Sequence, residues 1–94
     1  MARISEKGFQ SQVLELARLS GWRCYHTFDS RRSAAGFPDL CLVRRPLVLF
    51  IELKSETGRL RPEQAAWLAV LRGCEGVEVR LWRPGDWSEI ERRR

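Results

Sequence analysis

Three charged residues stand where strand patterns otherwise place apolar side chains or turns. Two of them, Glu52 and Lys54, close the segment LVLFIELK, which is the most apolar stretch of the chain. The two-residue period of a strand puts both on the face that carries Val48 and Phe50. A charge buried there is costly unless it is paired or bound to a metal ion. Two interpretations therefore compete: a salt bridge at a strand end, and a group of residues that performs chemistry.

The third charged residue, Asp39, supplies a second carboxylate. It opens the strand pattern 39–43, and the run Arg44 to Pro46 predicts a tight turn into the strand that holds Glu52. Such a hairpin brings the start of one strand beside the end of the other, so Asp39 should lie near Glu52. Asp39 could instead be only a turn carboxylate that follows Pro38. Two carboxylates beside a lysine favour a bound counter-ion, and Mg²⁺ takes oxygen ligands of this kind.

Two further polar residues, one in each predicted helix, fall among apolar residues and could belong to the same site. Glu6 falls within the apolar arc of the first predicted helix, although a carboxylate in a first turn also suits the helix dipole. Gln64 shares an arc with apolar residues of the second helix, where a buried amide needs hydrogen-bond partners and a helix-edge amide would have water. The apolar neighbours are Phe9, Val13, Leu16 and Ala17 in the first helix, and Trp67, Leu68 and Leu71 in the second.

The elements that must position these groups follow from periodicity and from turn residues. Their order is α-β-β-β-α-β with a short last helix, which predicts a mixed sheet with helices packed on it. We expect Asp86 and Glu89 to be a capping pair for the last helix, and the tail 92–94 to be frayed. The expected helices are 5–20 and 62–72, and the expected strands are 22–28, 39–43, 47–54 and 77–82.

Size and charge narrow the classes of protein. The 94 residues suit one domain, and 17 basic against 12 acidic residues give a net charge of +5. Lys7 and Lys54 are the only lysines, so fifteen of the basic residues are arginine. This favours a polyanion partner, nucleic acid before membrane, although a G- and C-rich genome would also enrich arginine. No apolar run is long enough to span a bilayer, and the three cysteines form no CxxC motif.

These motifs together resemble the VRR-NUC (virus-type replication-repair nuclease) family of the PD-(D/E)XK nuclease superfamily. The resemblance covers essentially the whole chain, so we expect residues 1–94 to form a single VRR-NUC-like domain. The matching segments are SEKGFQ at 5–10, GFPDL at 36–40, ELK at 52–54, GRLRPEQ at 58–64 with Trp67 and Leu71, and VRLWRPGDW at 79–87.

The resemblance implies a restriction-endonuclease-like α/β fold, an αβββαβ core whose mixed central sheet is flanked by helices. It also implies metal-dependent hydrolysis of DNA phosphodiester bonds with Mg²⁺ or Mn²⁺, at branched DNA such as Holliday junctions, forks or flaps. Lys54 resembles the lysine that attends the attacking water, and Gln64 the second-helix glutamine near the site. The implied metal ligands are Glu6, Asp39, Glu52 and the backbone carbonyl of Leu53.

Substrate contacts are expected from two basic loops, which could also be merely solvated. Their candidate DNA-binding residues are Arg31, Arg32 and Ser33 before Asp39, and Arg59 and Arg61 after Lys54. Such arginines contact phosphates, and no recognition helix is apparent, so we expect DNA shape rather than sequence to guide binding.

The expected partner is branched DNA, bound by a homodimer in the cytoplasm of a bacterial or phage-infected cell, with no membrane and no small-molecule cofactor. A non-catalytic basic DNA-binding module, and a nuclease of ordinary duplex or single-stranded DNA, are the alternatives.

Overall fold

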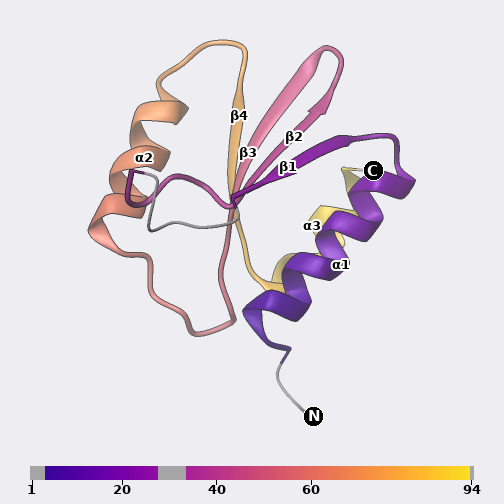
Figure 1. Cartoon of the computed structure of the whole chain (residues 1–94), viewed down its shortest axis with the longest axis horizontal. Coiled ribbons are helices and arrows are strands. Elements are labelled where there is room, and N and C mark those ends of the chain that lie inside the picture. The colour runs from indigo at the N-terminus through magenta and orange to yellow at the C-terminus, as the bar shows by residue number, and fades with distance from the viewer. Residues whose placement is uncertain (1–3, 28–33, 94) are drawn as a thin grey trace.

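The computed structural model of the chain describes residues 4–27 and 34–93, and it forms three layers (Figure 1). A four-stranded sheet in the order β1-β2-β3-β4 has α1 and α3 on one side and α2 on the other. The order of elements agrees with the prediction from the sequence. The elements are α1 (Glu6–Leu19), β1 (Arg23–His26), β2 (Leu40–Arg44), β3 (Leu47–Leu53), α2 (Pro62–Arg72), β4 (Glu78–Trp82), a 3₁₀ turn (Pro84–Asp86) and α3 (Trp87–Arg92).

Helix α1 is one residue shorter at each end than the 5–20 helix that the sequence predicts. The Ser5 hydroxyl accepts a hydrogen bond from the Gly8 backbone N–H at 3.0 Å, which caps the first turn. Gly21 follows the last turn with φ at +88°, a conformation that favours glycine. The apolar face of α1 then packs on the sheet, where Phe9 and Val13 are almost completely buried.

The sheet is mixed. Strands β1, β2 and β3 are antiparallel neighbours, and the predicted turn at Arg45-Pro46 joins β2 to β3. Strands β3 and β4 are parallel, so the chain must cross over between them, and α2 makes this crossover. Alternate residues of the strands, such as Leu40, Leu42 and Ile51, face α1 and form the main core. Leu68 and Val79 are also buried, but they do not belong to this core.

Both faces of β4 are covered, and helix α3 lies over the face that carries Trp82. Val79 and Trp82 are 5% and 2% exposed, although their spacing puts them on opposite faces of the strand. Ile90 of α3 is buried in the main core together with Trp82. Burial of one such side chain stabilises a fold by about 1.5–3 kcal/mol.

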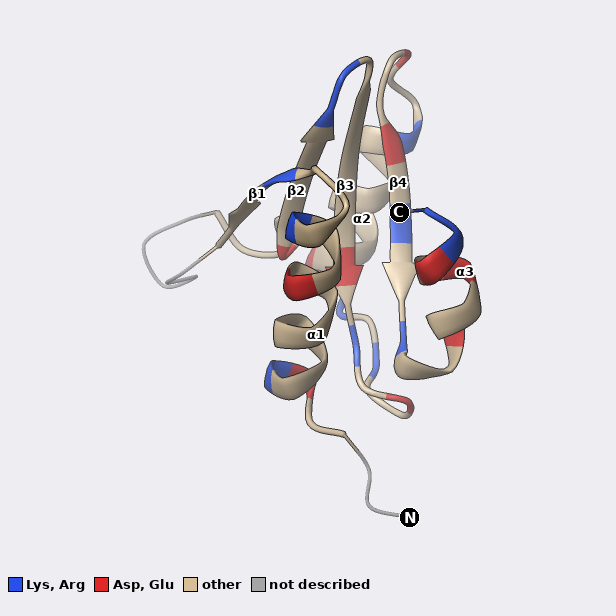
Figure 2. Cartoon of the chain, turned by 90° about the vertical axis from the view of Figure 1, so that its right-hand side faces the viewer, with Lys and Arg blue, Asp and Glu red and all other residues tan. Residues whose placement is uncertain are grey.

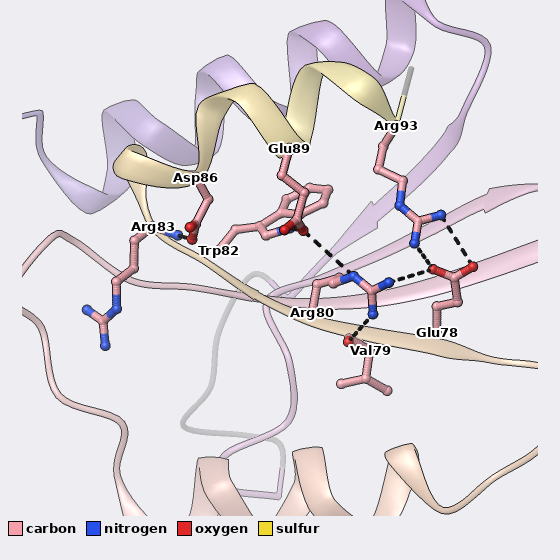
Figure 3. Close-up of polar contacts among 8 residues, drawn as sticks. All are labelled: Glu78, Val79, Arg80, Trp82, Arg83, Asp86, Glu89 and Arg93. Carbon is pink, nitrogen blue, oxygen red and sulfur yellow. Dashed lines mark hydrogen bonds and ion pairs between the residues drawn. The ribbon is translucent and has the colours of Figure 1, made fainter.

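A charged network joins α3 to β4 (Figure 3). The Arg93 guanidinium binds the Glu78 carboxylate, and Arg80 lies 3.3 Å from Glu78 and 3.7 Å from Glu89. Arg93 is therefore held in place, so the expectation of a frayed tail was wrong there, while Arg94 lies outside the described residues.

The expected capping pair of α3 was also wrong. The Asp86 carboxylate accepts a hydrogen bond from the Arg83 backbone N–H at 2.8 Å, within the 3₁₀ turn. The Glu89 carboxylate instead accepts from the Trp82 indole N–H at 2.9 Å. Within the described ranges, no helix is long and apolar enough to cross a membrane.

Candidate functional site

The two central carboxylates meet at the open end of the β2–β3 hairpin. Leu40 pairs with Ile51, so Asp39 and Glu52 are the next residues along the two strands. The Asp39 carboxylate also accepts a hydrogen bond from the Leu53 backbone N–H at 2.9 Å. The hairpin expected from the sequence is thus confirmed, and so is the proximity of these two side chains.

Glu52 is only 1% exposed, which is unusual for a glutamate. One carboxylate oxygen, Oε2, accepts a hydrogen bond from the Gln64 side-chain amide at 2.9 Å and lies 3.9 Å from the Lys54 ammonium. The other oxygen, Oε1, is buried and has no hydrogen-bond partner among the described residues. A buried acceptor without a partner is costly, so this oxygen is suited to an electropositive ligand.

The electrostatics of the pair favour protonation in the absence of a cation. Burial, and secondly the Asp39 carboxylate, raise the pKa of Glu52 to about 8, while the Lys54 ammonium opposes this rise. Burial also raises the pKa of Asp39, against the hydrogen bond from Leu53 and the charge of Lys54. Two carboxyl groups thus share an environment that does not compensate two negative charges.

Gln64 joins the second helix to Glu52. Its side-chain carbonyl accepts a hydrogen bond from the Arg61 backbone N–H at 2.9 Å, which closes the first turn of α2. Its amide donates to Glu52, so both ends of the side chain have partners. The amide is 7% exposed, as expected for a buried group rather than for one at a solvated helix edge.

A cleft of about 330 Å³, here called the Asp39 cleft, opens beside this pair. Glu6 is exposed at the first turn of α1 and contributes to the cleft wall, and its charge adds slightly to the raised pKa of Glu52. In the part of the chain that is described, no three His, Cys, Asp or Glu side chains converge closely enough to hold a metal ion. The cleft residues are Glu6, Thr27, Ala34, Gly36, Phe37, Asp39, Lys54, Arg61 and Gln64.

The loop before Asp39 is docked tightly against α2. Gly36 has φ at +91°, and a Cβ atom there would lie 2.5 Å from the Glu63 carbonyl carbon. The Trp67 indole N–H donates to the Ala35 carbonyl at 3.1 Å, and the Phe37 ring packs edge-on against Trp67 at 5.0 Å between centroids. Glycine is therefore required for the close approach that places Asp39 and Gln64 together.

Arg83 holds in place the loop that follows Lys54, a role that the sequence did not indicate. Its Nη1 atom donates to the carbonyls of Ser55 at 2.6 Å and Gly58 at 2.7 Å, so it holds the loop that follows Lys54. The Glu56 carbonyl, at 3.4 Å, is a third acceptor for this atom. Such contacts leave no mark in the sequence, because the loop and Arg83 are far apart along the chain.

The remaining predicted residues have different placements. Arg61 borders the Asp39 cleft, and Arg59 is exposed in the same loop. Arg31, Arg32 and Ser33 lie outside the described residues. A larger hollow of about 450 Å³ lies between α1 and the 84–87 segment, but Glu15 is its only ionisable lining residue, so it offers little chemistry.

The donor set fits a hard divalent cation. Asp39 and Glu52 offer carboxylate oxygens, and the unpartnered Glu52 Oε1 is the kind of atom that Mg²⁺ or Mn²⁺ would bind. A cation at this position would also stabilise the ionised forms of Asp39 and Glu52, whose burial raises both pKa values.

Comparison with known proteins gives one family. The model of the VRR-NUC domain matches residues 3–83. A solved structure described as a VRR_NUC domain protein superposes with a TM-score of 0.71 and 18% sequence identity, over 87% of this chain and 79% of that one. No curated protein matches the sequence. The mixed sheet with its flanking helices thus has the fold expected for a PD-(D/E)XK-like domain.

Proposed function

Because the chain belongs to the VRR-NUC domain family, a nuclease-type family, we propose that it is a divalent-metal-dependent endonuclease that hydrolyses DNA phosphodiester bonds. One observation carries the proposal. Glu52 is buried behind Asp39 and Lys54, which line an open cleft, and its Oε1 has no hydrogen-bond partner among the described residues. A protein that only binds DNA gains nothing from carboxylates at this place, because they repel phosphate.

Asp39 and Glu52 share one role, which is to bind the metal ion. Together they would hold Mg²⁺ or Mn²⁺, with the Leu53 carbonyl as a third ligand. Glu6 does not converge with the two carboxylates in the metal-free structure, so it would become a ligand only after a movement of its side chain. When bound, the ion lowers the pKa of a water molecule and polarises a phosphate oxygen.

The neighbouring side chains position the reacting groups. The Lys54 ammonium, already 3.9 Å from Glu52, stabilises a hydroxide or contacts a non-bridging phosphate oxygen. Gln64 fixes the Glu52 carboxylate, and Arg31, Arg32, Ser33, Arg59 and Arg61 bind phosphates on either side of the scissile bond.

We propose branched DNA as the substrate, as a Holliday junction, fork or flap. The net charge of +5 on a small domain supports a polyanion substrate, and no element of the described structure resembles a base-reading helix in a groove. Two symmetric cuts in a four-way junction require two active sites, so the proposal includes a homodimer.

The test uses two nearly isosteric variants, Asp39→Asn and Glu52→Gln. Each removes a metal-binding charge and keeps the side-chain shape, so each should fold and should lower cleavage about 100-fold or more. Labelled junction, flap, duplex and single-stranded DNA are incubated with Mg²⁺, Mn²⁺ or EDTA. Glu15→Gln, which removes an exposed carboxylate from the opposite side of α1, is the matched control and should cut like the wild type.

Cleavage that persists in EDTA, or in either folded variant, would contradict the proposed site. DNA binding without cleavage of any of the four substrates would instead favour the binding module. Sedimentation of the wild-type protein at the assay concentration tests the homodimer.

A further inference from the structure

Part of the sheet face that carries the site is uncovered. Side chains of every second residue share a face, so the rows Thr27–Asp39–Glu52 and Tyr25–Cys41–Phe50 lie side by side on the α2 face. A third row contains Arg23 and Val43. Helix α2 packs on the β3 and β4 side of this face, and no other described helix covers its β1 side (Figure 1 and Figure 2). We call Arg23, Tyr25 and Val43 the β1 strip.

The β1 strip is exposed, and it combines an aromatic, an aliphatic and a basic side chain. Tyr25 is 67% exposed and Val43 is 38% exposed, while Arg23 is exposed at the beginning of β1. Tyr25 is the only tyrosine of the chain, and its ring would be expected to be half covered in an ordinary strand. An exposed aromatic side chain next to a basic one is suited to a ligand with both a flat π-face and a negative charge.

The strip continues directly into the Asp39 cleft. Thr27 borders the cleft, and its backbone N–H donates to the Asp39 carbonyl at 3.0 Å. Tyr25 is two residues before Thr27 on the same face, about 7 Å away along the strand. A strand of nucleic acid with its phosphate in the cleft can therefore reach the Tyr25 ring with a neighbouring nucleotide.

The charges around the strip suit a polyanion. Neither β1 nor β2 contains an acidic residue, and Figure 2 shows basic residues at the beginning of β1 and at the hairpin end of β2 and β3. Arg45 is exposed in that hairpin turn. The one acidic residue of β4, Glu78, lies on the strand at the opposite edge of the sheet.

We propose that the β1 strip binds an unpaired nucleotide next to the scissile phosphate. The Tyr25 ring stacks on its base, and Arg23 binds its phosphate. The inference rests on the proposed function, because it takes the Asp39 cleft as the place of the scissile phosphate. Bases that are paired within a duplex cannot reach the ring, so the strip favours substrates with a single-stranded part.

Binding without catalysis tests the strip separately from the nuclease activity. The protein carries Glu52→Gln, and the buffer contains EDTA. Fluorescence anisotropy measures the Kd of labelled oligo(dT), of the same strand with abasic sites in place of bases, and of a blunt duplex. Tyr25→Ala should weaken oligo(dT) binding by at least about 5-fold relative to the duplex, and Tyr25→Phe should restore it. Leu19→Ala, which removes an 81% exposed side chain from α1, is the control.

The abasic strand identifies the contact. If Tyr25 stacks on bases, Tyr25→Ala leaves the Kd of the abasic strand unaltered, and bromouracil in the oligonucleotide photocrosslinks to Tyr25. Equal losses on all three probes, or no loss on oligo(dT), would overturn the inference. A change of oligomeric state in Tyr25→Ala would also overturn it, since the strip would then be an interface between copies. Wild-type protein that fails to cut DNA contradicts the proposed function instead, and it leaves these binding ratios measurable.

Discussion

Burial of the Glu52 carboxyl costs folding free energy, and the same burial suits this group to the metal binding proposed above. The carboxyl is buried beside Asp39, and among the described residues the Gln64 amide and the Lys54 ammonium, 3.9 Å away, compensate its charge. The cost appears as the raised pKa, because the neutral acid is easier to bury than the anion. A position that stability alone would fill with an apolar residue therefore holds a glutamate.

The pKa of Glu52 predicts the pH dependence of the metal-free protein. In the unfolded chain this carboxyl ionises at its ordinary pKa of 4.5, whereas in the folded protein it holds its proton to about pH 8. The folded state thus binds more protons between these values, so the free energy of unfolding should fall as the pH rises from about 4.5 to about 8. Thermal denaturation in EDTA measures this fall, and Glu52→Gln should flatten it.

The same linkage predicts the effect of Mg²⁺. The cation must displace the shared protons, so its stabilisation should be larger at pH 8 than at pH 6. A rise in Tm on addition of Mg²⁺ that is equal at both pH values, or that survives in Glu52→Gln, would argue against this pair as the metal site.

The contact between the 34–38 loop and α2 is the main interaction between elements that positions the site residues. Gly36 lets the loop backbone touch the first turn of the helix, and this turn carries Gln64. Arg83 performs a similar task on the other side, where it holds the 55–58 loop. Strand ends, a helix start and two loops thereby converge at one point although they are distant in sequence.

Two glycine variants separate close packing from backbone conformation. Gly36→Ala and Gly76→Ala both place a side chain at positive φ, which costs about 1–2 kcal/mol. Only Gly36→Ala also overlaps neighbouring atoms, since a Cβ at Gly76 meets nothing within 4 Å. We expect Gly36→Ala to lose about 1–3 kcal/mol more stability in urea denaturation, and to lose cleavage as Asp39 is displaced.

Equal destabilisation of the two glycine variants would show that the loop can move away from α2 without cost. Full cleavage by Gly36→Ala would show further that the docked loop does not position Asp39.

The whole molecule places an acidic site within a basic protein. The net charge of +5 suits a polyanion such as DNA, while the carboxylates of the proposed metal site, Asp39 and Glu52, repel phosphate in the absence of a cation. Figure 2 shows Lys and Arg on several separate elements rather than on one helix face. Such a distribution holds a nucleic-acid backbone in many registers, so shape rather than sequence should decide where the protein binds.

Salt dependence tests this view of binding. Arg61→Ser removes a basic residue at the cleft, so it should weaken binding to all DNA sequences alike and reduce the slope of log K against log salt by about 1. Arg72→Ser removes an exposed arginine from the far end of α2 and is the matched control. A strong preference of the wild type for one short sequence, or an unaltered slope in Arg61→Ser, would contradict the prediction.

The sequence by itself determined the order of the elements and the meeting of Asp39 with Glu52. Both depend on local signals: periodicity identifies the helices and strands, the Ser5 cap and Gly21 bound α1, and the Arg45-Pro46 turn sets the hairpin. The motifs GFPDL and ELK also sufficed to indicate the family. The roles of the site residues stay predictions.

Only the tertiary structure decided which distant groups complete the site and the core. The Arg83 contacts with the 55–58 loop, the α3 cover over Trp82 and the Arg93–Glu78 pair each join segments whose separation carries no periodic signal. The exposure of Tyr25 was also decided by the tertiary structure, because a strand pattern cannot show how far a helix from another part of the chain extends over the sheet. Contacts of this kind arise from packing, which depends on all elements at once.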